Sequence, residues 1–180
     1  MSQLFINIIG HNSSGKTTLA KKLAAEFGLN RVSGDDFRNF VGRHVAYFQN
    51  TDWSHPNEHT QQLNPLVINY RLELSWILLR ARAHVLIDGS GSTKAIRATY
   101  MDRVTAEFPE VTRVIIWADV AEAELRARLE QRGGQWVKQY EEIRRPSFEP
   151  PEQSEAEVVL RYTQDNYIEL AAKLHDLLNT

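Results

Sequence analysis

The chain has 180 residues, a net charge of −2 and no cysteine. This length suits one domain with a sizeable core, and a second full domain is not expected. The lack of cysteine excludes disulfides, thiolate metal sites and thiol catalysis, and the small net charge gives no overall attraction to nucleic acid or membranes. No segment is long and apolar enough to span a bilayer, and no signal segment is evident. We therefore expect a cytoplasmic protein with no membrane partner.

Strand and helix signals alternate along the chain, which is typical of βαβ units and a mainly parallel sheet. The apolar run 4–9 predicts a buried strand. Residues 17–27 predict a helix, because apolar side chains recur at every fourth position, and Gly28 marks its end. Residues 30–33 predict a short second strand.

The middle of the chain is less regular. Residues 43–64 are rich in His, Asn, Gln and Pro and show no clear period. The segment is longer than a structural connection requires, so we expect a functional loop or an insertion on the substrate side of the site. Helical periodicity resumes at 65–82, and 84–88 predicts a third strand before the turn 89–92.

The last third continues the alternation and completes the prediction for the fold. The expected elements are a helix to about 108, a strand at 111–117, a helix at 121–132, a polar proline-containing loop at 141–155, a strand at 157–161 and a helix at 164–178. We predict a single α/β domain over residues 1–180, with a five-stranded, mainly parallel sheet, helices on both faces and a small lid at about 121–145.

The most specific motif is Gly-His-Asn-Ser-Ser-Gly-Lys-Thr at 10–17, which matches G-x-x-x-x-G-K-[ST] between a strand and a helix. Its glycines let the backbone wrap a phosphate, and the helix start adds a positive end. Lys16 would reach the β- and γ-phosphates, and the Thr17 hydroxyl would ligate Mg²⁺. The alternative, a chance glycine loop, is disfavoured by this context. The expected cofactors are ATP and Mg²⁺, and the expected cradle is Gly10, Asn12, Ser13, Ser14, Gly15, Lys16, Thr17 and Thr18.

Acids follow the second and third predicted strands, and the carboxyl ends of parallel strands line one crevice. Asp35, beside Asp36, would orient a substrate hydroxyl and accept its proton as the hydroxyl attacks the γ-phosphate. The pair could also be a helix N-cap, and the pattern does not decide which aspartate is the base. Asp88 would support the Mg²⁺ shell, unless it is only a polar strand end before a glycine turn.

The helix predicted at 121–132 carries Arg126, Arg128 and Arg132. Arg128 and Arg132 are four residues apart and share a face. Guanidinium groups on a closing segment stabilise the charge of a transferring phosphate. The alternative is a solvated face balanced by glutamates. The sequence does not tell which arginine reaches the γ-phosphate.

These segments resemble, in chain order, the small P-loop kinases. They are most similar to the predicted kinases related to the kinase domain of 5′-hydroxyl polynucleotide kinases, and the phosphate loop is also similar to nucleoside and nicotinamide-riboside kinases. The resemblance implies that Asp35 is the general base and that Arg38 binds substrate. It also implies that Arg128 and Arg132 are the lid arginines. The segments that carry it are 10–17, 32–38, 85–88 and 124–133.

The sequence thus predicts an ATP-dependent kinase that transfers the γ-phosphate to a hydroxyl of a small-molecule or nucleotide-like acceptor. A nucleic-acid 5′ end is possible but not favoured, because the chain is near neutral. The alternatives are a nucleotide-dependent switch or ATPase module without an acceptor, and an adaptor with an inactive loop. The guanine signature Asn-Lys-x-Asp is absent, which disfavours a GTPase. Neither the acceptor nor the oligomeric state can be predicted.

Overall fold

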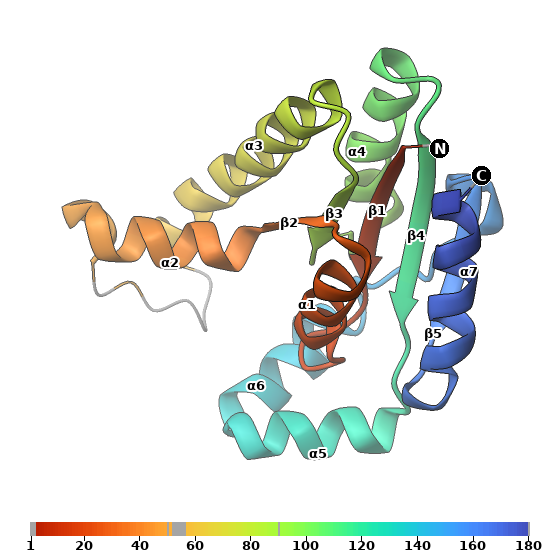
Figure 1. Ribbon diagram of the computed structural model, residues 1–180. Helices are drawn as coiled ribbons and strands as arrows, with labels where there is room; N and C mark the ends of the chain where they lie inside the picture. Colours follow the sequence, from red (N-terminus) through yellow and green to blue (C-terminus); the bar gives the residue numbers. More distant parts are fainter. Residues whose placement is uncertain (1–2, 50, 52–56, 90, 180) are drawn as a thin grey trace.

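A five-stranded parallel sheet forms the centre of the computed structural model, which describes residues 3–49, 51, 57–89 and 91–179 (Figure 1). Its order is β2-β3-β1-β4-β5, and every neighbouring pair is parallel. Both faces of such a sheet are covered, which explains why its central strand β1 is a largely apolar run. The predicted α/β sheet is confirmed. The strands are β1 (Leu4–Ile9), β2 (Asn30–Ser33), β3 (Val85–Asp88), β4 (Thr112–Ala118) and β5 (Val158–Tyr162).

The helices cover the two faces of the sheet and extend past its carboxyl end. They are α1 (Lys16–Phe27), α2 (Gly34–His44), α3 (Glu58–Arg80), α4 (Lys94–Glu107), α5 (Glu122–Arg132), α6 (Gly134–Gln139) and α7 (Tyr167–Asn179). Short 3₁₀ turns lie at Ala46–Phe48, Gln153–Glu155 and Gln164–Asn166, and a π-turn lies at Tyr140–Arg144. Among the described residues, none of the helices combines the length and the apolar character that crossing a membrane requires.

Alternate side chains of the strands pack into two separate cores, as the strand period of two requires. On one face, Ile6 of β1 packs with Leu23 of α1 and Leu174 of α7. On the other face, Phe5 of β1 packs with Trp76 of α3 and with α4. Because β1 lies between β3 and β4 and is fully buried, the loop that follows it starts from a rigid position.

The segment 43–64, expected to be a functional loop or an insertion, is helical at both ends. Helix α2 runs to His44, and α3 begins at Glu58 rather than near residue 65. Asn57 caps α3, since Thr60 N donates to Asn57 Oδ1 at 2.9 Å and Asn57 N donates to Thr60 Oγ1 at 2.8 Å. Pro65, a residue that normally interrupts a helix, lies inside α3. Residues 50 and 52–56 of the expected loop lie outside the described ranges.

The α2–α3 pair projects from the sheet (Figure 1) and has a small core of its own. Val41 of α2 and Phe48 pack against Leu63 and Val67 of α3, with Phe37 partly buried beside them. This core keeps the two helices together where they leave the sheet. The two packed helices therefore form one side of the region at the carboxyl end of β2, and we call them the α2–α3 wall.

The lid region also differs from the expectation. The predicted loop at 141–155 begins as a π-turn that continues α6. Leu125 and Leu129 of α5 pack with Tyr140 and with Trp136 of α6 in a separate small core. Figure 1 shows α5 and α6 lying across the end of the sheet, below α1. The region that the sequence predicts as a lid, about 121–145, is therefore a helical unit with its own hydrophobic contacts.

Candidate functional site

The phosphate-loop motif forms a tight turn between β1 and α1. Gly10 has φ 144° and Gly15 has φ 88°, values that favour glycine. A Cβ on Gly10 would lie 2.6 Å from the Ala118 carbonyl oxygen and 2.8 Å from Ser14 Oγ, so no side chain fits there. Gly15 caps α1 without a side-chain hydrogen bond, which leaves the first N–H groups of the helix open to an anion.

The other predicted cradle residues lie in or next to this turn. Asn12 and Ser13 are partly exposed, and Ser13 has φ 64°. Ser14 is buried, and its Oγ has no hydrogen-bond partner within the described residues. Thr17 and Thr18 are exposed at the start of α1. The geometry suits a phosphate group, because it combines a glycine backbone, an unpaired hydroxyl and a helix N-terminus.

Lys16 lies at the centre of the site. Its Nζ donates a hydrogen bond to the His11 carbonyl oxygen at 2.5 Å. Burial lowers the Lys16 pKa to about 8, although the negative charges of Asp88 and Asp35 act in the opposite direction. Both acids therefore lie close enough to act on one ammonium group, as the shared strand ends predicted.

Asp88 ends β3 with a buried side chain that has two kinds of partner. Thr17 Oγ1 donates to its Oδ1 at 3.2 Å. Arg31 on β2 binds the other oxygen, with Nε at 2.8 Å and Nη2 at 2.6 Å from Oδ2. One carboxylate oxygen is thus neutralised by an arginine, while the other faces the hydroxyl of the phosphate loop.

The Thr17–Asp88 pair fits a magnesium ion in its chemistry. Mg²⁺ prefers hard oxygen ligands and completes its shell with water and substrate phosphates. The described ranges contain no group of three or more His, Asp or Glu side chains that could hold a metal. An ion at this place would therefore depend on nucleotide oxygens as well as on the protein.

The structure separates the two aspartates at the start of α2. Ser33 is the N-cap, since its Oγ accepts from Asp36 N at 3.3 Å, so the alternative that the aspartates cap the helix is wrong. Asp36 pairs with Arg31 at 2.7 Å. Asp35 pairs with Arg38 at 2.8 Å and has an exposed side chain. Its charge also favours the protonated form of Lys16.

Arg128 and Arg132 both reach the phosphate loop from α5. Arg128 Nη1 donates to the Ser13 carbonyl oxygen at 3.2 Å, and Arg132 Nη1 donates to Ser13 Oγ at 3.0 Å. Arg126 instead pairs with Glu122 and Glu141 on the outer side. The shared face predicted for Arg128 and Arg132 therefore contacts the loop, although Arg128 also pairs with Glu124 and Arg132 remains exposed.

Three further arginines contribute positive charge to the site, and no motif or spacing in the sequence selects them. Arg31 holds Asp88 and Asp36. Arg144, in the π-turn, acts electrostatically on both Lys16 and Arg38. Arg71 of α3 packs against Gly34, the residue before Asp35. Buried or bridging arginines resemble solvated ones in sequence, because only tertiary packing decides their surroundings.

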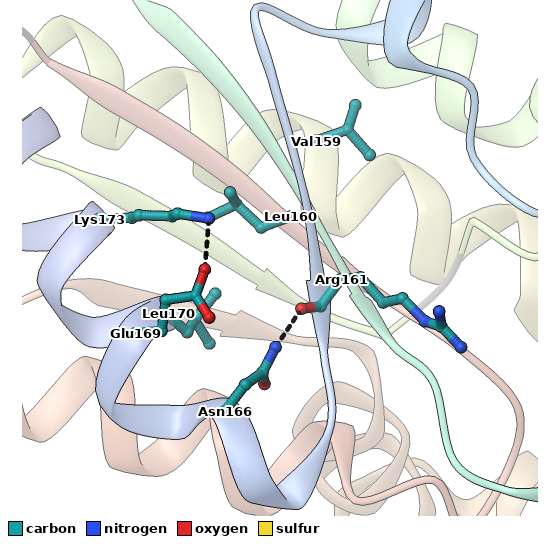
Figure 2. A pocket seen from close by; sticks show the side chains of 7 residues that line it. All are labelled: Val159, Leu160, Arg161, Asn166, Glu169, Leu170 and Lys173. Atoms are coloured by element: carbon teal, nitrogen blue, oxygen red, sulfur yellow. Dashed lines mark hydrogen bonds and ion pairs between the residues drawn. The ribbon is translucent and has the colours of Figure 1, made fainter.

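A pocket of about 240 Å³ lies elsewhere, between β5 and α7 (Figure 2). Glu169 and Lys173 form an ion pair at its side, and Asn166 donates to the Arg161 carbonyl oxygen. No residue that lines it belongs to the phosphate loop, to α2 or to α5. We therefore place the functional site at the loop on geometric and chemical grounds.

The sheet order, the glycine turn and the converging acids define a P-loop nucleotide-binding domain of the α/β class. The chain belongs to the AAA domain family AAA_33, whose model matches residues 5–146. No curated protein matches the sequence.

Solved structures share the fold at low sequence identity. A protein of Chloroflexus aurantiacus J-10-fl, provisionally assigned as a kinase, is similar with a TM-score of 0.76 and 18% identity over 99% of this chain and 98% of that one. A sugar kinase of Janibacter sp. HTCC2649 is similar with a TM-score of 0.57 and 18% identity, over 97% of this chain and 95% of that one. A single-residue variant of the APS kinase CysC of Mycobacterium tuberculosis is similar with a TM-score of 0.58 and 15% identity, over 99% of both chains. The expected likeness in fold to small P-loop kinases is thereby confirmed.

Proposed function

We propose that the protein is an ATP- and Mg²⁺-dependent kinase that transfers the γ-phosphate to a hydroxyl group of a small-molecule or nucleotide-like acceptor. One observation carries the proposal: Asp88 at the end of β3 bonds to Thr17 of the phosphate loop, and Asp35 follows the neighbouring strand β2 in the first turn of α2. One acid would serve the metal and the other the acceptor. A switch or an ATPase module does not need the second acid at this position.

On the donor side, the backbone from Gly10 to Gly15 would hold the triphosphate, and Lys16 would neutralise its β- and γ-phosphates. Arg128 and Arg132 already contact the loop and would stabilise the negative charge of the transferring group. Mg²⁺, held by Thr17 Oγ1 and Asp88 Oδ1, would supply charge neutralisation at the phosphate oxygens.

On the acceptor side, Asp35 would orient the hydroxyl and accept its proton. The hydroxyl oxygen forms a bond to the γ-phosphorus, the bond from the γ-phosphorus to the bridging oxygen breaks, and ADP leaves. Arg38 holds Asp35 at 2.8 Å and Asn64 of α3 at 3.1 Å, so it links the proposed base to the α2–α3 wall. Phe37 and Tyr70 stack in this wall with centroids 4.4 Å apart. The acceptor would bind between this wall and the phosphate loop.

The structural neighbours support a small-molecule acceptor, since they include a sugar kinase and an APS kinase. The direct test is ATP consumption with and without a mixture of hydroxyl compounds, followed by mass spectrometry of the mixture. The proposal expects consumption that depends on the mixture, a product that gains one phosphate, and loss of both in Lys16→Met. Equal consumption without any acceptor would identify an ATPase or a switch instead.

A further inference from the structure

Among the described residues, Arg71 is a buried charge for which no partner is found. It lies in the middle of α3 and is 5% exposed. Its Nε is a buried donor with no hydrogen-bond partner, and the described part of the chain shows no ion pair to its guanidinium. Arginine is almost never buried unless paired, because the desolvation of its charge is costly. Packing alone therefore does not explain why an arginine occupies position 71.

Arg97 of α4, also a buried arginine, shows what a structural role looks like in this protein. It is 0% exposed, and its Nε and Nη2 bind the two carboxylate oxygens of Glu155 at 2.5 and 2.8 Å. Its Nη1 also donates to the carbonyl oxygens of Gly91 and Glu149 at 2.9 and 2.8 Å. Arg97 thus links the segment that contains Glu149 and Glu155 to α4. Arg71 has no equivalent partners, so the fold does not use it in this way.

The Arg71 guanidinium lies beside the site. A Cβ on Gly34 would be 2.3 Å from Arg71 Nη2, so the group packs directly on the residue before Asp35. A Cβ on Gly89 would be 3.9 Å from Arg71 Nη2 and 4.0 Å from Lys16 Cε. Gly89 follows Asp88 at the end of β3. The Arg71 guanidinium therefore lies beside both Gly34, which precedes Asp35, and Gly89, which follows Asp88.

The surroundings of the Arg71 and Arg38 guanidinium groups are positively charged. The charges of Arg71 and Arg144 both act on Arg38, and Asp35 is the one carboxylate among the charges that dominate there. The positive end of α2 begins at Gly34, in contact with Arg71. The cations of the site, Lys16, Arg31, Arg38, Arg71 and Arg144, outnumber its aspartates, Asp35, Asp36 and Asp88, which leaves an excess of positive charge. An oxyanion is the group that balances it, and guanidinium binds phosphate and carboxylate through paired N–H donors.

We propose that Arg71, together with Arg38, binds an anionic group of the acceptor, so that the acceptor is an alcohol that carries a phosphate or a carboxylate. This rests on the proposed function, whose site it shares. A neutral sugar or nucleoside would leave the Arg71 charge buried and unpaired in the complex. The anionic group also fixes the acceptor at a second point, away from the hydroxyl that Asp35 would orient.

The test separates this anion site from the phosphate loop. The protein is first saturated with the non-hydrolysable analogue AMP-PNP and Mg²⁺, which fills the loop. Inorganic phosphate is then titrated by calorimetry, and acetate is titrated in parallel to distinguish a phosphate site from a carboxylate site. The variants are Arg71→Met, Arg71→Lys and the control Arg80→Met, since Arg80 lies on the same helix but is exposed and pairs with Glu107.

We expect the wild type to bind one further anion, and Arg71→Met to weaken this binding by at least about tenfold. Arg71→Lys should fall between the two, because it keeps the charge and loses the paired donors. Arg80→Met should bind as the wild type does. Arg71→Met should also melt at or above the wild-type temperature, since it removes an unpaired buried charge. The added anion should raise the melting temperature of the wild type and not that of Arg71→Met.

Three results would overturn the proposal: no anion binding by the wild type, equal binding by Arg71→Met, or an Arg71→Met protein that melts well below the wild type or does not fold. The last result would show that Arg71 is structural, as Arg97 is. Failure of the kinase proposal gives a different signature. Anion binding that depends on Arg71, without transfer of phosphate to any acceptor, would refute the kinase and leave the anion site standing.

Discussion

The ammonium of Lys16 gives the sharpest prediction about nucleotide binding. Burial lowers its pKa to about 8, and the charges of Asp88 and Asp35 only partly compensate. The negative charge of a bound triphosphate favours the protonated form. Nucleotide affinity should therefore be constant up to about pH 8 and fall above it.

The expected size of the effect follows from the pKa. At about pH 9.5 roughly one Lys16 in thirty is protonated in the free protein, so affinity should be about 30-fold lower than at neutral pH. Stability should change in the opposite sense. Between about 8 and 10.5 the folded protein holds fewer protons on Lys16 than the unfolded chain does, so the free energy of unfolding should rise with pH across this window.

The assay is a titration with a fluorescent ATP analogue across this pH range at constant ionic strength. The matched control is Lys16→Met, which should bind the analogue more weakly but with little pH dependence, because the titrating group is gone. The wild-type and control curves should converge as the pH rises. A wild-type affinity that stays constant to about pH 9.5 would refute the assignment of Lys16 as a buried phosphate ligand.

Three other substitutions test the supports of the site by urea denaturation. Arg31→Met should lower the free energy of unfolding by about 2–3 kcal/mol, because the buried Asp88 loses its arginine while Arg31 itself is partly exposed. A decrease below about 0.5 kcal/mol would show that the pair contributes little. Arg97→Met should cost about 3–5 kcal/mol, since Glu155 is left buried without its partner, and wild-type stability would contradict this. Gly10→Ala should lose at least about 1 kcal/mol through strain at φ 144° and should also bind nucleotide poorly; unchanged binding would show that the cradle tolerates a side chain.

Much of the fold could be predicted because the sheet is buried on both faces. The predicted strand at 4–9 and the short strand at 30–33 coincide with β1 and β2. The apolar residues of β1 face the two cores, so its burial can be predicted from its composition. The phosphate loop could be predicted because its glycines and Lys16 have few other uses in this context.

The α2–α3 wall could not be predicted as well because it projects from the sheet. Helix α2 and the first turns of α3 pack through a small core around Leu63, whereas the second half of α3, where the periodicity is readable, packs on the sheet through Trp76. Pro65 and the polar residues around it favour a loop when they are considered alone. The Asn57–Thr60 capping box was a usable signal for the start of α3.

The arginines of the site were the hardest to predict. Arg128 and Arg132 could be selected by their spacing on a helix, but Arg31, Arg71 and Arg144 have no pattern of this kind. Arg71 is buried because Gly34 lacks a side chain and lets the guanidinium approach. This depends on a contact between α2 and α3, which the sequence does not show.

The central claim is that Asp35, and not Asp36, serves the acceptor at the phosphate loop. The most direct measurement is the rate of phosphate transfer by Asp35→Asn and Asp36→Asn, with the acceptor found in the screen, at saturating ATP. We predict that Asp35→Asn lowers kcat by about 10²–10⁴-fold with nearly unchanged nucleotide affinity, whereas Asp36→Asn, which alters a pair with Arg31, stays within a few-fold of the wild type. Transfer by Asp35→Asn at the wild-type rate would contradict the claim.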